Sequence, residues 1–301
     1  MEEETELILD KYRSAGRILA EVREEAVERI KEGVALLEVA EFVENSIREK
    51  GAQPAFPCNI SRNEEAAHAT PSIDDKSVFG KDIVKLDIGA HIDGYIGDSA
   101  VTVDLSGNNE GLVKASEAAL SEAIKIIRDG VSTVEIGEVI ENTIREQGYK
   151  PVVNLTGHGL IRYNSHAPPT IPNVKYEHGV ILRENNVIAI EPFATDAQGA
   201  GKVVESGNAE IYSLLKAKPV RLREAKKLLE EIKKYQGLPF AKRWLPRERL
   251  DLALRTLKNT GALRDYPVLR EEGKGLIAQA EHTVIVKEDG CEVTTAAFKL
   301  D

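Results

Sequence analysis

Apolar residues recur every three to four positions in four stretches of the chain, the spacing that is typical of amphipathic helices. The first stretch covers residues 7–30 and ends before Gly33, and the second covers residues 36–49. Two more cover residues 110–128 and 133–147. We therefore expect a helix in each stretch, with one face of every helix directed toward a core.

Alternating apolar and polar positions, rich in β-branched residues, predict strands elsewhere. The longest such segment covers residues 83–105 and contains Asp93-Gly94, a dipeptide typical of two-residue hairpin turns. We therefore expect a β-hairpin centred on that dipeptide, in a mixed α+β domain. Shorter strands are predicted at residues 152–155 and 187–192, and a closing pair at residues 278–286 and 292–298.

Residues 211–259 have a different character from the rest of the chain. Their pattern is helical, it is interrupted by several Pro and Gly residues, and it lacks the turn-and-strand signals found elsewhere. The part from Lys216 to Lys258 holds 14 Lys and Arg against 5 Asp and Glu, although the whole chain has a net charge of −10. We interpret this segment as a basic helical insertion in the α+β domain.

Composition narrows the class of protein. A chain of 301 residues can bury a sizeable core, and 42% hydrophobic with 30% charged residues is ordinary for a soluble globular protein. No apolar run is long enough to span a membrane and the N-terminus is not signal-like, so we expect a cytoplasmic protein. The acidic balance argues against a protein-wide nucleic-acid surface, and Cys58 and Cys291 are expected to be free thiols.

Asp87 and Asp98 are the first chemical signal. If Asp93-Gly94 forms a two-residue turn, Asp98 lies opposite Gly89, and both carboxylates project from one face of the hairpin as diagonal neighbours roughly 7–8 Å apart. Two carboxylates on a buried face repel one another unless a cation lies between them. The alternative is a pair of surface aspartates near a turn, and a three-residue loop would reverse the parity.

Two glutamates and one histidine extend this signal. Glu191 ends a continuous apolar run, and Glu281 lies within another, so neither is expected to face water. A buried carboxylate needs a cation or a proton, although one alone could be a satisfied ion pair. His158 lies between two glycines after a short apolar segment, whereas a lone histidine is more often structural. Together these side chains form an oxygen-rich ligand set with enough donors for two divalent ions.

These motifs, in this order, resemble the methionine aminopeptidases of type II in their archaeal form. The resemblance runs almost end to end, and the basic segment between Glu191 and Glu281 is what separates type II from type I. The short N-terminus departs from the long charged extension of eukaryotic members. The matching motifs are Lys85-Leu86-Asp87-Ile88-Gly89, Asp98-Ser99-Ala100, Thr156-Gly157-His158-Gly159, Ile190-Glu191-Pro192 and Ala280-Glu281-His282-Thr283.

The resemblance implies an α+β pita-bread fold with pseudo-twofold halves and a helical insertion. It places the catalytic domain at residues 1–205 and 265–301. It places a subdomain typical of type II at residues 206–264, which we call the basic insertion.

The resemblance also implies the site residues and their roles. Two divalent ions, for which Co, Mn, Fe(II) and Zn are all acceptable, would activate a water for hydrolysis of the first peptide bond. The ions would be bound by Asp87, Asp98, His158, Glu191 and Glu281. Catalytic roles fall to His68, His166 and Glu191, and substrate binding falls to Phe56, His68, His166 and Tyr266. Ser165 stands where some relatives have a larger apolar residue.

The implied activity is removal of the initiator methionine from nascent proteins when the second residue is small. The basic insertion could then contact the ribosome, or it could be a solvated helical face. One rival is a proline-directed peptidase of the same fold, which normally carries a large extra N-terminal domain. Another is a non-enzymatic binding module, but such relatives usually lose metal ligands. Neither a membrane nor a specific nucleic acid is expected as a partner.

Overall fold

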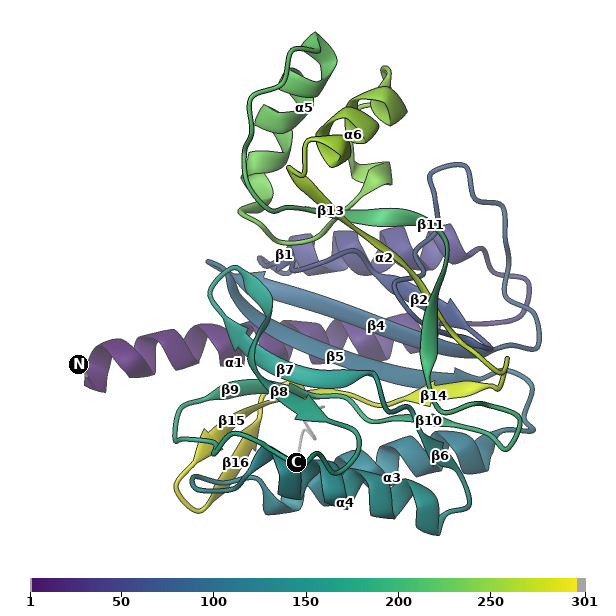
Figure 1. Cartoon of the computed structure of the whole chain (residues 1–301), viewed down its shortest axis with the longest axis vertical. Coiled ribbons are helices and arrows are strands. Elements are labelled where there is room, and N and C mark those ends of the chain that lie inside the picture. Colours follow the sequence, from purple (N-terminus) through teal and green to yellow (C-terminus); the bar gives the residue numbers. More distant parts are fainter. Residues whose placement is uncertain (1, 297–301) are drawn as a thin grey trace.

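The computed structural model describes residues 2–296 of the chain (Figure 1). The helices are α1 (Glu2–Val27), α2 (Leu36–Glu49), α3 (Glu110–Ile126), α4 (Thr133–Glu146), α5 (Arg223–Ile232) and α6 (Leu250–Asn259), with short 3₁₀ helices η1 (Lys233–Tyr235) and η2 (Lys242–Trp244). The strands are β1 (Gln53–Pro54), β2 (Asn59–Arg62), β3 (Glu65–Ala67), β4 (Ile83–Ile92), β5 (Tyr95–Asp104), β6 (Lys150–Pro151), β7 (Thr156–Ile161), β8 (Asn164–Pro172), β9 (Val187–Ile190), β10 (Phe193–Thr195), β11 (Val203–Leu214), β12 (Phe240–Ala241), β13 (Leu263–Glu271), β14 (Ile277–Gln279), β15 (His282–Lys287) and β16 (Gly290–Val293).

The helices expected from the apolar spacing are confirmed as α1 to α4. Helix α1 ends at Val27 rather than at residue 30, because the next residues form tight turns in which Ile30 N donates to Val27 O. Helix α4 begins with a capping box: the Ser132 side chain accepts from Val134 N, and Glu135 accepts from Ser132 N. Local side-chain chemistry therefore sets the start of α4.

Strands β4 and β5 form the predicted hairpin. Asp93 and Gly94 both have positive φ, as a two-residue turn of the right twist requires. Gly89 pairs with Asp98, and Asp87 pairs with Ala100. The predicted register is therefore confirmed, and both aspartates lie on the same face of the hairpin.

Three of the predicted strand boundaries were wrong for one shared reason. Residues 152–155 are a loop between β6 and β7, β9 ends before Glu191, and residues 278–286 are divided into β14 and β15. At each point the chain crosses between the small sheet β14-β10-β6 and the sheet β16-β15-β9-β7-β8. An apolar run does not reveal such a crossing, because the apolar pattern on either side of it is the same whichever sheet the strand joins.

The closing strand predicted at residues 292–298 is β16, which spans Gly290–Val293 and pairs with β15. Residues 297 and 298 lie outside the described part of the chain. The start of the segment read as helical was also wrong, because Ile211–Leu214 belong to β11. These residues pair with β13. Their burial alternates as in a strand: Ile211 and Ser213 are buried, whereas Tyr212 and Leu214 are only partly buried.

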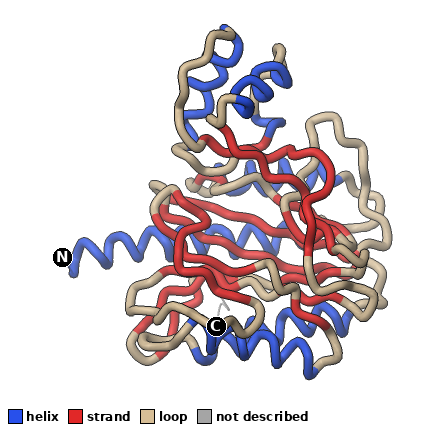
Figure 2. Tube along the Cα trace, viewed as in Figure 1, coloured by secondary structure: helices blue, strands red, loops and turns tan. Residues whose placement is uncertain are grey.

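Helices cover the sheets from two sides (Figures 1 and 2). Helices α1 and α2 pack on the hairpin through a core that includes Leu19, Val43 and Leu86. Helices α3 and α4 lie along the bottom of the view and pack on β9 and β15 through a core that includes Ile140 and Ile188. The strands between these two layers carry the polar residues described below.

Helices α5 and α6 stand at the top of Figure 1, above β11 and β13. They enclose a separate apolar core that includes Leu229, Phe240 and Leu257. No helix among residues 2–296 combines the length and apolar character needed to cross a membrane. Cys58 and Cys291 are both free thiols, as expected.

Candidate active site

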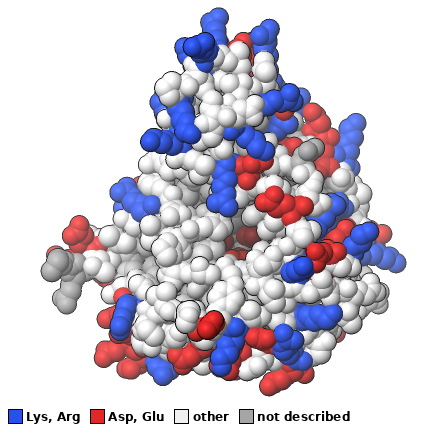
Figure 3. All heavy atoms as spheres, in the orientation of Figure 1, with Lys and Arg blue, Asp and Glu red and all other residues white. Residues whose placement is uncertain are grey.

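A cavity of about 340 Å³ opens where the two helix-covered layers and the basic insertion meet. Figure 3 shows a hollow at the centre of the molecule with acidic atoms on its floor. Every site residue expected from the sequence lines this cavity: Phe56, His68, Asp87, Asp98, His158, His166, Glu191, Tyr266 and Glu281. Residues separated by more than 200 positions in the chain are therefore neighbours in space.

The aspartates and glutamates reach the cavity by different routes. Asp87 and Asp98 project from adjacent strands, β4 and β5. Glu281 is held beside β5 because its backbone N–H donates to Ala100 O at 3.0 Å and its carbonyl accepts from Ala100 N at 3.4 Å. Glu191 lies in the break between β9 and β10, and Glu281 lies in the break between β14 and β15. The two breaks are equivalent, because β9 pairs with β15 and β10 pairs with β14.

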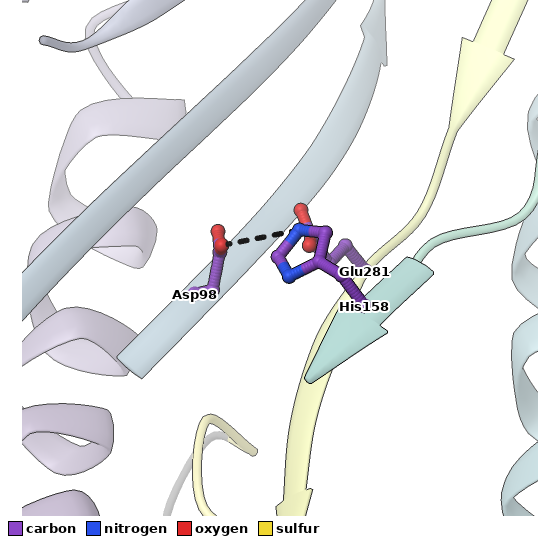
Figure 4. Close-up of side chains that lie close together, drawn as sticks. All are labelled: Asp98, His158 and Glu281. Atoms are coloured by element: carbon purple, nitrogen blue, oxygen red, sulfur yellow. Dashed lines mark ion pairs between the residues drawn. The ribbon is translucent and has the colours of Figure 1, made fainter. Parts of the chain in front are cut away.

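His158 lies on β7, where glycines on both sides allow close packing. A Cβ atom at Gly157 would lie 2.3 Å from Ala189 O, and one at Gly159 would lie 2.1 Å from Pro168 O. Only glycine fits at either position. His158 Nε2 is thereby brought 3.9 Å from Asp98 Oδ2 and 3.4 Å from a Glu191 carboxylate oxygen, and Figure 4 shows the imidazole beside Asp98 and Glu281.

This donor set fits a divalent cation. Asp98, His158 and Glu281 are all buried, and each offers a ligand atom within 4.8 Å of those of the other two. Asp87 Oδ1 and Asp98 Oδ1 are buried with no hydrogen-bond partner among the described residues, an arrangement that is costly unless a cation lies nearby. Asp87 and Glu191 line the same cavity outside this group of three.

Burial perturbs every titratable group in the cluster. Desolvation raises the pKa of Asp87 to about 7, and it raises the pKa of Asp98, Glu191 and Glu281 well above the usual values. The charge of Asp87 adds to the effect on the other three acids. Burial lowers the pKa of His158 to about 4, so the imidazole is neutral at physiological pH, which is the form that binds metals.

Sequence reasoning missed Gln279, which is fully buried on β14. Its side-chain amide lies 3.4 Å from a Glu191 oxygen and 3.5 Å from a Glu281 oxygen, and its backbone N–H donates to Thr102 Oγ1 at 2.8 Å. Gln279 therefore stands behind both glutamates. Its position two residues before Glu281 was the available signal.

The pocket wall opposite the acids begins with Phe56. Its ring lies on Gly89 so closely that a Cβ atom at that position would be 2.3 Å from Phe56 Cε1. His68 has a φ of 64° and its Nδ1 lies 3.2 Å from Pro267 O. Because a carbonyl can only accept, Nδ1 carries the proton and Nε2 keeps its lone pair.

Two further residues complete the wall. The Tyr266 ring packs edge-on against His68 with centroids 5.4 Å apart, and its hydroxyl lies 3.1 Å from Ser213 Oγ. The His166 ring lies tilted against the His158 ring with centroids 4.5 Å apart, and its Nδ1 shares a 3.0 Å hydrogen bond with Ser165 Oγ. The unusual Ser165 therefore orients a candidate catalytic histidine. Although His166 is exposed, surrounding protein atoms lower its pKa well below the usual value.

The cavity also has a wall that the sequence did not predict. Ile211, Pro239 and Arg264 line it from the strands and loops that carry α5 and α6. The Arg264 guanidinium lies 5.0 Å above the Tyr266 ring. The insertion thus contributes side chains to the pocket as well as covering it.

Known proteins with similar sequences are metallopeptidases, in agreement with the metal-binding character of the cavity. Residues 10–288 match metallopeptidase family M24. The methionine aminopeptidase of Archaeoglobus fulgidus is 54% identical over 290 residues, covering 96% of this chain and 98% of the relative. That of Methanocaldococcus jannaschii is 50% identical over 289 residues, covering 95% and 98%. The expected archaeal, type II resemblance is confirmed.

Solved structures define the fold. A Thermotoga maritima methionine aminopeptidase superposes with a TM-score of 0.71 at 24% identity, over 96% of each chain. A thermophilic Arx1 reaches 0.83 at 17% identity, over 98% of this chain and 92% of its own. The prolidase of Pyrococcus furiosus reaches 0.63 at 21% identity, but this chain covers only 64% of it. The expected pita-bread fold is therefore confirmed.

The acid cluster predicts an unusual pH dependence for the metal-free protein. The folded Asp87 carboxyl has a pKa of about 7 against a usual value of 3.8, so between these values the folded state binds more protons than the unfolded state. The free energy of unfolding should therefore fall as pH rises from 5 to 7, by up to about 1.4 kcal/mol per pH unit for each such group. Denaturant unfolding in EDTA measures this slope.

Asp87→Asn removes the contribution of this one group and should make the profile less steep, with the other three acids still contributing. Mn²⁺ added to the wild type should restore stability at pH 7, by about 2.7 kcal/mol at one hundred times its Kd. Metal-free protein that became more stable from pH 5 to 7 would contradict the buried-acid interpretation.

Proposed function

The chain belongs to metallopeptidase family M24 and is a hydrolase, and on that premise we propose that it removes N-terminal methionine from other polypeptides. The observation that carries this proposal is the single cavity in which buried acids lie opposite the wall of Phe56, His68 and Tyr266. An acidic floor suits metal ions and a free ammonium group, and an aromatic wall suits a thioether side chain.

The proposed metal ligands are Asp87, Asp98, His158, Glu191 and Glu281, which would hold two divalent ions. Such ions supply an activated water and polarise the scissile carbonyl when bound. The orphaned oxygens of Asp87 and Asp98 support this assignment, as does the neutral state of His158. Carboxylates with one imidazole accommodate Co, Mn, Fe(II) and Zn alike.

Protein groups around the ligands would handle the protons. Glu191 would accept the proton of the attacking water, a role that suits a carboxylate whose pKa is raised by burial. His166, oriented by Ser165, would donate to the developing oxyanion. His68 would accept from the amide nitrogen or the released amine, because its Nε2 keeps a lone pair while Nδ1 donates to Pro267 O.

The substrate side chain would lie against Phe56 and Tyr266, with His68 and His166 beside the scissile bond. The cavity of about 340 Å³ fits one extended residue and the start of the next. The second residue would therefore be small. Acting in the cytoplasm on nascent chains would supply such N-termini continuously.

Turnover on synthetic peptides tests the substrate. With Mn²⁺ present, Met-Ala-Ser should be cleaved after methionine at least about a hundredfold faster, in kcat/KM, than Ala-Pro, which lacks the side chain that fills the pocket. Met-Glu-Ser should also be poor, because its second side chain is long and acidic. Faster cleavage of Ala-Pro would favour the proline-directed peptidase instead.

His158→Ala tests the metal site. The variant should lose at least about a hundredfold in kcat/KM and bind less metal by elemental analysis, because the imidazole is the cluster's one nitrogen ligand. His178→Ala, on the surface away from the cavity, is the matched control and should match the wild type. If His158→Ala kept both metal and turnover, the ligand assignment would be wrong.

We also propose that the basic insertion, residues 206–264, is a subdomain through which the enzyme contacts ribosomal RNA. The observations that support this are its charge, with 14 Lys and Arg between Lys216 and Lys258, and its separate apolar core. Basic side chains mark the surface of α5 and α6 at the top of Figure 3. The acidic balance elsewhere would keep contact confined to this end.

Ribosome co-sedimentation measures this contact. Binding should weaken by about tenfold or more between 50 and 200 mM salt, because contacts with phosphates release counterions. Lys226→Glu with Lys227→Glu, both on α5, should weaken it further, whereas Lys31→Glu, in the exposed turn between α1 and α2, should not. Salt-independent binding would exclude an electrostatic contact.

A further inference from the structure

A buried ion pair joins the basic insertion to helix α2. Arg243 in η2 pairs with Glu44, and their side chains are only 3% and 4% exposed. The other Glu44 oxygen accepts from the indole nitrogen of Trp244 at 2.7 Å. Desolvation raises the pKa of Glu44, and the charge of Arg243 opposes that effect. A charge pair this deep needs hydrogen bonds on both sides, and among the described residues only Nε of the Arg243 guanidinium is left without a partner.

Glu44 also holds the segment that carries Phe56. Its carboxylate accepts from the backbone N–H of Cys58 at 3.1 Å. Phe56 and Cys58 are separated only by Pro57, whose ring fixes its own φ, so a constraint on Cys58 reaches Phe56. On the other side, Ala55 N donates to Gly89 O at 2.9 Å. The Phe56 segment is thus anchored at both ends.

Arg243 holds the segment that carries His68 as well. Its guanidinium donates to Thr70 Oγ1 at 2.8 Å and to Pro71 O at 3.0 Å. The Thr70 hydroxyl in turn donates to Cys58 O at 2.6 Å. Both polar groups of the Cys58 backbone therefore end at one guanidinium, through Glu44 on one side and Thr70 on the other.

We propose that Arg243 is a positioning residue for the methionine pocket. From its place in the basic insertion, it sets the distance between the wall that carries Phe56 and the wall that carries His68. This inference rests on the proposed function, because it concerns the pocket for the substrate side chain. It gives the insertion a role in substrate recognition that is separate from any contact with a partner. Asp98, His158, Glu191 and Glu281 come from other segments of the chain, whereas Asp87 shares β4 with Gly89 and pairs with Asn59, the residue after Cys58.

The variants are chosen so that folding and positioning can be separated. Arg243→Met alone would leave Glu44 buried and unpaired, so the main variant is Glu44→Gln with Arg243→Met, in which both charges are absent. Arg243→Lys keeps the charge but lacks the forked donor that reaches Glu44 and Thr70 together. The control is Arg247→Met. Arg247 also joins the insertion to the loop that follows Thr70, through an ion pair with Asp74, but these two side chains are 63% and 79% exposed.

Kinetics on Met-Ala-Ser with Mn²⁺ should show a split between KM and kcat. The double variant should raise KM about tenfold and change kcat less than about threefold, because a displaced wall weakens ground and transition states alike. Calorimetry with L-methionine should show a matching rise in Kd, independent of turnover. Arg243→Lys should be intermediate, and Arg247→Met should match the wild type in both measurements.

The results separate this inference from the proposed function. Failure of the wild type both to cleave Met-Ala-Ser and to bind L-methionine would overturn the proposed function, and the inference with it. A wild type that does both, beside a folded double variant with unchanged KM and methionine Kd, would overturn the positioning role alone. Equal losses in kcat and metal content would also overturn it, since they would indicate general structural damage.

Discussion

The structure depends on keeping several carboxylates together away from water. Asp98 and Glu281 are almost fully buried, and Asp87 and Glu191 reach the same cavity. Burial raises the pKa of all four carboxyls, and the charges of Asp87, Asp98 and Glu191 add to the effect on neighbouring acids, so the cluster is unfavourable in its charged form unless cations bind. The same arrangement therefore favours the binding of metal ions and destabilises the folded protein when no metal is bound.

The sheets provide this arrangement through their breaks as well as their strands. Glu191 and Glu281 lie where paired strands pass from one sheet into another, so their backbones are outside the regular hydrogen-bonded pairing of the strands. Gln279 lies behind both, and glycines on either side of His158 let β7 approach its neighbours closely. Packing from α1 to α4 holds the sheets in place, which makes a cluster of like charges tolerable.

Much of this could be predicted from the sequence alone. The Asp93-Gly94 turn determined the hairpin register, and the period of two then placed Asp87 and Asp98 on one face. Apolar spacing determined α1 to α4, because amphipathic helices carry their pattern locally. The glycines beside His158 and the apolar runs around Glu191 and Glu281 indicated burial. Local signals of this kind do not depend on the rest of the fold.

Only the tertiary structure decided what lies across the cavity and what holds it. The sequence did not show the crossings at residues 152–155, 191–192 and 280–281, because the apolar pattern beside each crossing fits either sheet. Ile211 and Arg264 reach the pocket only because β11 pairs with β13, and Glu44 meets Arg243 across almost 200 residues. Sequence determines local conformation and the chemistry that is present. Long-range packing decides which of those groups meet, because that depends on every element at once.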